Sequence, residues 1–360
     1  MATQTAPVRS TASRLAWLTA VASFTYALAG LYWMAGGRGF PFGVENDPLA
    51  YHQSLLESVT RSSAARWVFG LGLAGAACAV ILTRRRTMGG TGVLLSAFAW
   101  TQAVAYALVI PDGRPLVAVA HIPVLIVGKP FGWPPDVTIS SQLSWPILNQ
   151  ILLMALGALW AATAVVFRRR TAGQCLVCGR GDVTVAWTLP CGAARWGRWA
   201  VIVAVIPPVV YATTRISWAF GVPFGVSEKF LTEQAADAPE IFVAGAAMAG
   251  LALGGAVLTT GLVFRWGEVF PRWIPGLRHR PVRPRTAIVP AVVVAFLMTS
   301  SGVGWVRAAV SGYFPDGAIG EDFGTVGPGA LLPVWGVALG AAAYAYYLRR
   351  RPACKRCQRR

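Results

Sequence analysis

Two cysteine pairs carry the clearest chemistry in the sequence. Cys175 and Cys178 form one C-x-x-C pair, and Cys354 and Cys357 form another about half a chain length later. Two such pairs suit tetrahedral zinc, because each short loop brings two sulfurs to one ion and the second loop completes the shell. The glycine after Cys178 permits the turn that is needed beyond the second ligand. We therefore predict one structural zinc site made of all four thiols.

Other uses of these thiols stay open. A metal site could combine the first pair with Cys191 and a further partner such as His279. Either pair could be a dithiol redox centre, because C-x-x-C is also the spacing of thiol–disulfide oxidoreductases. No thioredoxin-like βαβ pattern surrounds either pair, and the thiols could also be reduced and inert. Disulfides are not expected in a cytoplasmic setting.

The cysteine pairs are parts of a longer repeated pattern. An arginine run precedes each pair, at Arg168 to Arg170 and at Arg349 to Arg351, and each run follows a long apolar segment. A Gly-x-Pro-Phe-Gly-Val motif also occurs twice, starting at Gly39 and at Gly221. Repetition of this kind outranks any single motif in deciding the fold. It predicts a tandem duplication.

The composition indicates an integral membrane protein. The chain has 360 residues, of which 55% are hydrophobic and 13% are charged, whereas soluble domains carry about 25% charged residues. The apolar residues form blocks of about 20, the length that crosses a hydrocarbon core. Eight blocks qualify as spanning helices, at residues 15–36, 67–83, 90–110, 146–167, 199–219, 241–264, 287–306 and 330–348.

Two apolar segments raise separate questions. The first block is too long for the core of a signal peptide and lacks a convincing cleavage site, so we expect it to remain as a membrane helix. Residues 116–127 are apolar but too few to span a bilayer, and they are expected to be interfacial or re-entrant. Residues 1–13, which precede the first block, are expected to be a disordered cytoplasmic tail.

The distribution of charge predicts the orientation. Most of the 32 Lys and Arg residues fall on one side if the N-terminus is cytoplasmic, and all but two of the 14 acidic residues fall on the other. Basic residues are retained on the cytoplasmic face. Both termini and both cysteine pairs are therefore expected in the cytoplasm of a bacterium, with the chain in the plasma (inner) membrane.

The net charge of +18 does not point to nucleic acid, because the basic residues stand in short runs where apolar blocks end. Such juxtamembrane clusters set topology and attract anionic lipid headgroups. The bilayer and those headgroups are the expected partners.

These observations predict an all-α integral membrane fold of two parallel four-helix repeats, N-in and C-in. The expected divisions are the tail at 1–13, a first repeat at 14–180, a cytoplasmic linker at 181–197 and a second repeat at 198–360. Parallel repeats are related by an axis along the membrane normal.

A catalytic constellation is not evident in the sequence. No nucleotide-binding loop, nucleophile elbow or paired-carboxylate arrangement occurs, and the predicted spans hold almost no ionisable group. The external acidic residues, Asp47 among them, are expected to be solvated loop charges. Of the histidines, His52 and His279 are expected at the surface and His121 at the membrane interface.

The stretch from Gly30 to Gly37, with Tyr32 and Trp33, is followed by Phe-Pro-Phe-Gly. It resembles an actinobacterial polytopic membrane family of unknown function that carries a Tyr/His-x-Trp-x-x-Gly-Gly signature on its first helix. The similarity covers mainly the first half, because the second half keeps only Trp218 and the Pro-Phe-Gly. The resemblance implies a four-helix membrane fold. Because the family has no established activity, it implies no functional residues.

The sequence thus predicts a multi-pass membrane protein of unassigned substrate. A non-enzymatic scaffold, accessory or small-molecule-handling role is expected, with the four-cysteine zinc site as a structural element. The alternatives are a transporter of a neutral or lipophilic solute and a membrane thiol–disulfide oxidoreductase.

Overall fold

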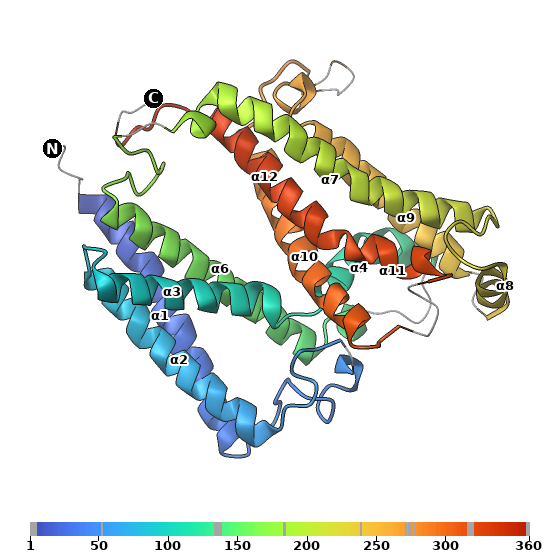
Figure 1. Cartoon of the computed structure of the whole chain (residues 1–360), viewed down its shortest axis with the longest axis horizontal. Helices are drawn as coiled ribbons and strands as arrows, with labels where there is room; N and C mark the ends of the chain where they lie inside the picture. The colour runs from blue at the N-terminus through green and yellow to red at the C-terminus, as the bar shows by residue number, and fades with distance from the viewer. Residues whose placement is uncertain are drawn as a thin grey trace. The chain divides into compact units, whose positions relative to one another are not determined.

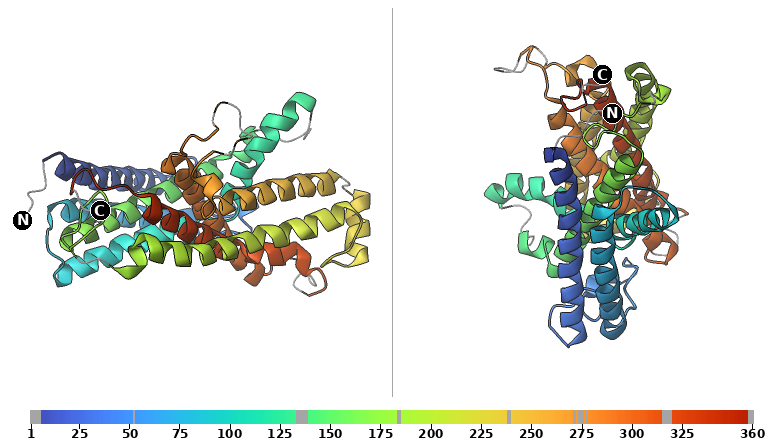
Figure 2. Two further views of the ribbon diagram at one scale, coloured as in Figure 1. Left: turned by 90° about the horizontal axis from the view of Figure 1, so that it is seen from above. Right: turned by 90° about the vertical axis from the view of Figure 1, so that its left-hand side faces the viewer.

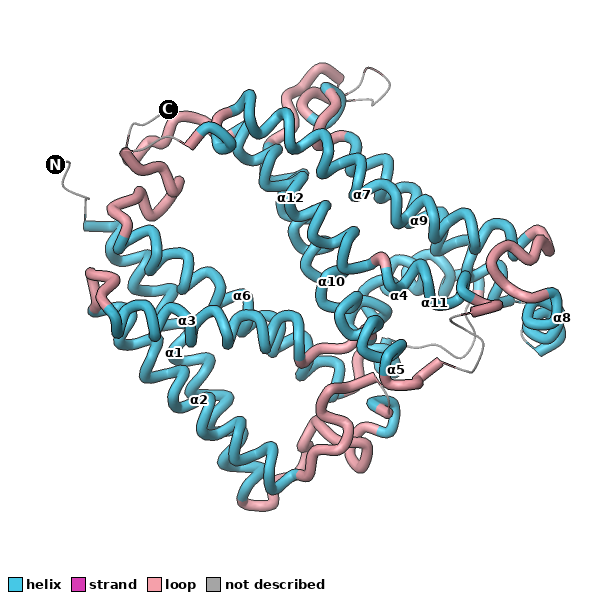
Figure 3. Tube along the Cα trace, in the orientation of Figure 1, coloured by secondary structure: helices cyan, strands magenta, loops and turns pink. Residues whose placement is uncertain are grey.

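The computed structural model describes residues 6–51, 53–132, 139–182, 185–237, 240–270, 272, 276, 278–314 and 320–357. Within these ranges every long element is a helix, and the one β-type pairing is an isolated bridge between Val269 and Pro281 (Figure 3). Eight helical segments are long and apolar enough to cross a membrane, which is the number predicted. They are Ser13–Met34, Arg61–Arg84, Gly90–Val109, Trp145–Thr171, Pro190–Ala219, Glu240–Thr260, Pro284–Val310 and Phe323–Arg350.

The chain divides into two compact units. The first unit comprises Met1–Thr184 together with Pro352–Arg360, and the second comprises Val185–Arg351. The last residues of the chain therefore group with the first unit, although they were predicted to belong to the second repeat. The end of the expected linker, residues 190–197, is part of a long helix.

Four long helices build the first unit. They are α1 (Ala6–Met34), α2 (Arg61–Arg84), α3 (Gly90–Val104) and α6 (Trp145–Thr171). Helix α1 packs on α2 and on α6, and α3 packs on α6 (Figure 1). Helix α1 begins at Ala6, so the expectation of a disordered segment through residue 13 is wrong for its described part. The helix of the span continues back through this segment.

Large side chains and small residues alternate in the core of this unit. Trp160 and Phe167 on α6 are buried. Gly72 on α2 faces the backbone of Ser23 on α1, where a β-carbon would lie 2.8 Å from the carbonyl oxygen. Gly157 meets the α3 backbone at Ala103 in the same way. Small residues at such positions let membrane helices approach closely.

Shorter elements connect α3 to α6. A π-helical segment, Ala105–Val109, extends α3, and it is followed by α4 (Arg114–Gly128), a 3-10 turn (Lys129–Phe131) and α5 (Ile139–Gln142). Helix α4 contains the apolar segment that was predicted to be too short to span, and its 15 residues do not reach the length of a membrane crossing.

The second unit contains its own set of packed helices. Helix α7 packs on α9 and on α12, and α10 packs on α12 (Figure 2). Tyr346 and Ala343 of α12 are fully buried at its centre. Its helices are α7 (Pro190–Ala219), α8 (Glu228–Asp237), α9 (Glu240–Thr260), α10 (Pro284–Val310), α11 (Phe323–Ala330) and α12 (Leu332–Arg350), with 3-10 turns at Ala186–Thr188 and Arg265–Gly267.

The Gly-x-Pro-Phe-Gly motif takes the same backbone form in both units. All four of its glycines have φ between 73° and 78°, a region that favours glycine: Gly39, Gly43, Gly221 and Gly225. The tryptophan that precedes each motif is buried, with 4% of Trp33 and 6% of Trp218 exposed. Each motif therefore turns the chain beside a buried tryptophan at the end of α1 or α7.

Candidate metal centre

The first cysteine pair lies in a tight loop after α6. The amide of Gly179 donates to the carbonyl of Cys175 at 2.8 Å, and the amide of Cys175 donates to the carbonyl of Arg180 at 2.9 Å. Gly179 has a φ of 72°, which closes the loop directly after Cys178. The glycine identified in the sequence thus provides the turn that was predicted for it.

The side chains around this loop attach it to the end of α6. Leu176, between the two cysteines, is buried and packs on Val166 of α6. Arg169 donates from Nη1 to the carbonyl of Leu176 at 3.3 Å. Its own carbonyl accepts from the amide of Gln174 at 2.8 Å. The loop is held to the helix at several points.

The second cysteine pair follows α12 and joins the first pair. The Sγ of Cys354 lies 4.0 Å from that of Cys175, and the Sγ of Cys357 lies 3.6 Å from that of Cys178. All four sulfurs lie within 4.8 Å of one another. The predicted meeting of the two pairs is confirmed.

The distances fit a single tetrahedral ion. Zn–S bonds of about 2.3 Å place tetrahedral sulfurs about 3.8 Å apart. The two sulfur–sulfur separations fall on either side of that value, and the whole cluster would contract only slightly around a metal. Cys178 and Cys354 are buried, and Cys175 and Cys357 are partly exposed. Bulk water is thus excluded from one side of the cluster.

Backbone amides donate to the sulfurs of both loops. Burial raises the pKa of the Cys178 thiol to about 12, as do the neighbouring thiols, although the Arg180 amide opposes the rise. Burial also disfavours a thiolate at Cys354, but there the amides of Cys357 and Arg356 outweigh it, together with neighbouring thiols, and lower the pKa to about 6. Thiolate is the form that binds metal. The cluster therefore stabilises a thiolate before a cation arrives.

Basic residues surround the cluster. Four thiolates and one Zn²⁺ carry a net double negative charge, which needs compensation in a partly buried setting. Arg180 donates from Nη1 to the carbonyl of Pro352 at 3.1 Å and so joins the two loops. Arg169 approaches Gly179, where a β-carbon would lie 3.1 Å from Nε. Lys355 and Arg356 stand between the second pair of ligands. The arrangement suits an anionic metal–thiolate centre.

Comparisons of the chain with protein-family models, with curated proteins and with solved structures find no match. The resemblance on the first helix therefore stays an expectation. Function is inferred below from the geometry of the chain itself.

Other metal ligands considered in the sequence are not part of a cluster. Among the described residues, the four cysteines are the one group of three or more potential ligands with atoms close enough to share an ion. Cys191 is exposed near the start of α7 and His279 is exposed in a turn, and neither belongs to that group. The Nδ1 of His121 lies 2.8 Å from the carbonyl of Val117, within α4. His52 lies outside the described residues.

The arginine runs have contacts that their sequence pattern does not reveal. Arg170 donates from Nη1 to the carbonyls of Leu82 and Thr83, at the end of α2. Arg349 donates to the carbonyl of Leu262, just after α9. The last carbonyls of a helix have no partner inside it. Arg170 satisfies two such carbonyls of α2, and Arg349 satisfies a carbonyl of the turn after α9, in addition to any effect on topology.

In the second unit, Glu268 adds ion pairs to the contact between the arginine run of α12 and the turn after α9. Glu268 forms ion pairs with Arg349 at 3.3 Å and with Arg350 at 3.4 Å. The hydroxyl of Tyr346 donates to the carbonyl of Gly267 at 2.8 Å. The turn after α9 is thereby fixed to the end of α12.

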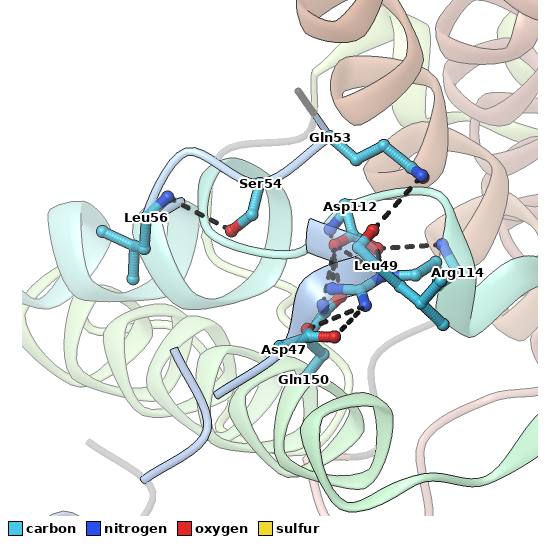
Figure 4. A network of polar contacts seen from close by, with 8 residues as sticks. All are labelled: Asp47, Leu49, Gln53, Ser54, Leu56, Asp112, Arg114 and Gln150. Atoms are coloured by element: carbon cyan, nitrogen blue, oxygen red, sulfur yellow. Dashed lines mark hydrogen bonds and ion pairs between the residues drawn. The ribbon is translucent and has the colours of Figure 1, made fainter. Parts of the chain in front are cut away.

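The opposite end of the first unit holds a buried polar network (Figure 4). The Arg114 guanidinium lies between two carboxylates, 2.8 Å from Asp47 and 2.7 Å from Asp112. Gln150 of α6 donates to Asp112 at 2.8 Å. Burial by itself lowers the pKa of Arg114, but the hydrogen bonds and charges of Asp112 and Asp47 raise it above its ordinary value. The expectation that Asp47 is a solvated loop charge is wrong, because 6% of it is exposed.

Proposed function

We propose that the chain is a multi-pass protein of the bacterial inner membrane in which Cys175, Cys178, Cys354 and Cys357 bind one structural zinc ion. The observation that carries the proposal is the convergence of four sulfurs, within 4.8 Å of one another, from two segments far apart in the sequence. A metal there ties the chain that leaves α12 to the chain that leaves α6. This serves a scaffold, accessory or small-molecule-handling protein and requires no catalysis.

The proposed architecture is two copies of one four-helix unit, with both termini in the cytoplasm. Corresponding helices pack in the same pairs, because the α1–α2, α1–α6 and α3–α6 contacts of the first unit have their counterparts in α7–α9, α7–α12 and α10–α12. The contact of Arg170 with Leu82 also corresponds to that of Arg349 with Leu262. These parallels support a duplication.

The bilayer and anionic headgroups of its cytoplasmic leaflet are the proposed partners. Arg84, Arg86 and Arg168 are exposed where two spans end. Each such residue adds about 1 kcal/mol of attraction to an anionic surface.

Elemental analysis of the purified full-length protein tests the zinc site. We expect one zinc per chain, and Cys178→Ser or Cys354→Ser should remove it. Cys191→Ser is the matched control, because that thiol is exposed and lies outside the cluster, and it should retain zinc. Less than half a zinc per wild-type chain, with the four cysteines fully reactive under native conditions, would overturn the proposal. Iron in place of zinc would overturn the identity of the metal, since sites of four thiolates take both.

A thiol–disulfide oxidoreductase is the second candidate. The lowered pKa of Cys354 favours it, as does the 3.6 Å separation of the Cys178 and Cys357 sulfurs. Exchange with a substrate disulfide would leave these two thiols joined as a disulfide and release the substrate as a dithiol, and exchange with a dithiol substrate would reverse the step. A Cys354→Ser variant separates the candidates: a redox enzyme loses activity and keeps its thermal stability, whereas a zinc site loses stability.

A further inference from the structure

An arginine within a membrane span of the second unit has an unusual setting. Arg215 lies on α7, and the carbon at the centre of its guanidinium lies 4.2 Å from the centroid of the Trp218 ring and 5.2 Å from that of Tyr211. Trp218 is itself fixed, because it is buried and donates from Nε1 to the carbonyl of Phe224 at 2.9 Å. The guanidinium therefore rests on a rigid aromatic platform.

No carboxylate of the described residues pairs with this guanidinium. Two acidic residues beyond α7 are engaged elsewhere, since Glu233 of α8 pairs with Lys229 at 3.9 Å and Asp322 accepts from the amide of Ser227 at 2.7 Å. The Tyr211 side chain hydrogen-bonds to Arg215 and the aromatic faces attract its cation, but neither ring carries a negative charge that would neutralise it. A partly buried arginine near the end of a span, with no acidic partner among the described residues, is a candidate for binding an anion.

The first unit lacks this arginine at the corresponding place. Tyr26 and Trp33 have the same spacing as Tyr211 and Trp218, and their rings pack directly, edge to face, with centroids 6.1 Å apart. Gly30 stands where the second unit has Arg215, and a β-carbon there would lie 2.6 Å from the Phe69 amide nitrogen. The first unit therefore has no room at this position for a side chain such as that of arginine.

The second unit has room for the longer side chain. Gly245 of α9 faces Arg215, and a β-carbon at Gly245 would lie 3.6 Å from Cδ of the arginine, an ordinary contact distance. The arginine is thus accommodated between α7 and α9.

The depth of Arg215 suggests what its guanidinium binds. It precedes the end of α7 at Ala219 by four residues, which is about 6 Å along a helix and corresponds to the headgroup level for a spanning segment. A stacked guanidinium presents a planar fork of donors that matches a phosphate or carboxylate in bidentate fashion. We propose that Arg215 is the centre of a phosphate-binding site at this end of the second unit, with Tyr211 and Trp218 as its platform.

Binding of phosphate by the full-length protein in detergent tests the site. The probes are dioleoylphosphatidylglycerol, dioleoylglycerol without the phosphate, and inorganic phosphate, with bound lipid counted by native mass spectrometry. Arg215→Gln and Arg215→Lys should each weaken binding of the phosphatidylglycerol by about tenfold, the value of one charge-assisted hydrogen bond. Arg198→Gln is the matched control, an exposed arginine near the other end of α7, and it should bind as the wild type does.

The arms of the experiment separate the sources of the phosphate. Competition by inorganic phosphate supports a soluble anion, and its failure to compete supports a lipid headgroup. Equal binding by Arg215→Gln and wild type, or equal binding of dioleoylglycerol, overturns the proposal. Retained zinc and unchanged thermal unfolding show that each variant is folded.

Discussion

One sulfur in each cysteine loop accepts hydrogen bonds from backbone amides, although the pKa values of the two thiols shift in opposite directions. The amide of Arg180 donates to Cys178, and the amide of Arg356 donates to Cys354, so the donor lies two residues after the acceptor in both loops. Amide donors that favour a thiolate also hold the sulfur in place for a metal. The loops are therefore organised for a metal by their backbones as well as by their side chains.

Gly179 is the residue on which the first loop depends most. Gly179→Ala should destabilise the protein by about 1–2 kcal/mol, because its φ of 72° is unfavourable for any residue with a β-carbon. The new methyl group would also approach Arg169, at 3.1 Å from Nε. We expect weaker zinc binding, measured by competition with a chromophoric chelator, together with a lower unfolding temperature.

Gly173→Ala is the control for this variant. Gly173 also has a positive φ, of 65°, but nothing lies within 4 Å of a β-carbon there, so only the backbone strain is shared. It should lower stability and leave zinc affinity nearly unchanged. Equal losses of zinc affinity in both variants would show that the crowding at Arg169 has no effect on the metal centre.

The meeting of the cysteines could be predicted from the sequence, whereas the network at Arg114 could not. Cys175 and Cys354 stand at equivalent places in a repeated pattern, which implies that they share a face of the membrane. Asp47 and Arg114 are 67 residues apart and belong to no repeated pattern. Their contact depends on how a loop folds over α6, and neither spacing nor composition reports on that.

At the scale of helices, the arginine runs join neighbouring elements. Arg170 reaches from the end of α6 to the end of α2, and Arg349 reaches from α12 to the turn after α9. A cation at the C-terminal end of a helix also interacts favourably with the helix dipole. The runs therefore also stabilise the ends of neighbouring elements, in addition to the effects on topology and on lipid attraction that were predicted for them.

Replacement of Arg170 tests this role. Arg170→Gln should lower the free energy of unfolding by about 2 kcal/mol, because hydrogen bonds from a charged group are lost at the carbonyls of Leu82 and Thr83. Arg168→Gln is the control, since Arg168 is exposed and belongs to the same run, and it should change stability little. Thermal unfolding in detergent measures both. Equal effects would show that only the net charge of the run matters.

The hydrophobicity of the sequence predicts how many helices span the membrane but not the residues at which they begin. The number of spans could be predicted because each needs a block of apolar residues. Helix α7 begins at Pro190 and not near residue 199, because proline fits the first turn of a helix and the polar residues that follow continue it beyond the apolar block. Hydropathy marks the buried length of a helix but not its start.

At the scale of the whole chain, the helices of the two units pack in corresponding pairs. We therefore expect both units to place their basic residues on the same side of the membrane. Each unit has an even number of candidate spans. An even number returns the chain to the side on which it started. With all eight candidates crossing the membrane, the C-terminal tail is expected on the same side as the loop after α6, which the proposed shared metal requires.

Accessibility of single thiols tests this orientation. Cys191, exposed near the start of α7, should react with a membrane-impermeant maleimide only after the membrane is opened, because the predicted topology places it in the cytoplasm. A cysteine introduced as Leu49→Cys, where 67% of the side chain is exposed between α1 and α2, should react in intact cells. Labelling of Cys191 in intact cells would reverse the topology. It would also place the metal centre in an oxidising compartment, where disulfides would compete with zinc for its thiols.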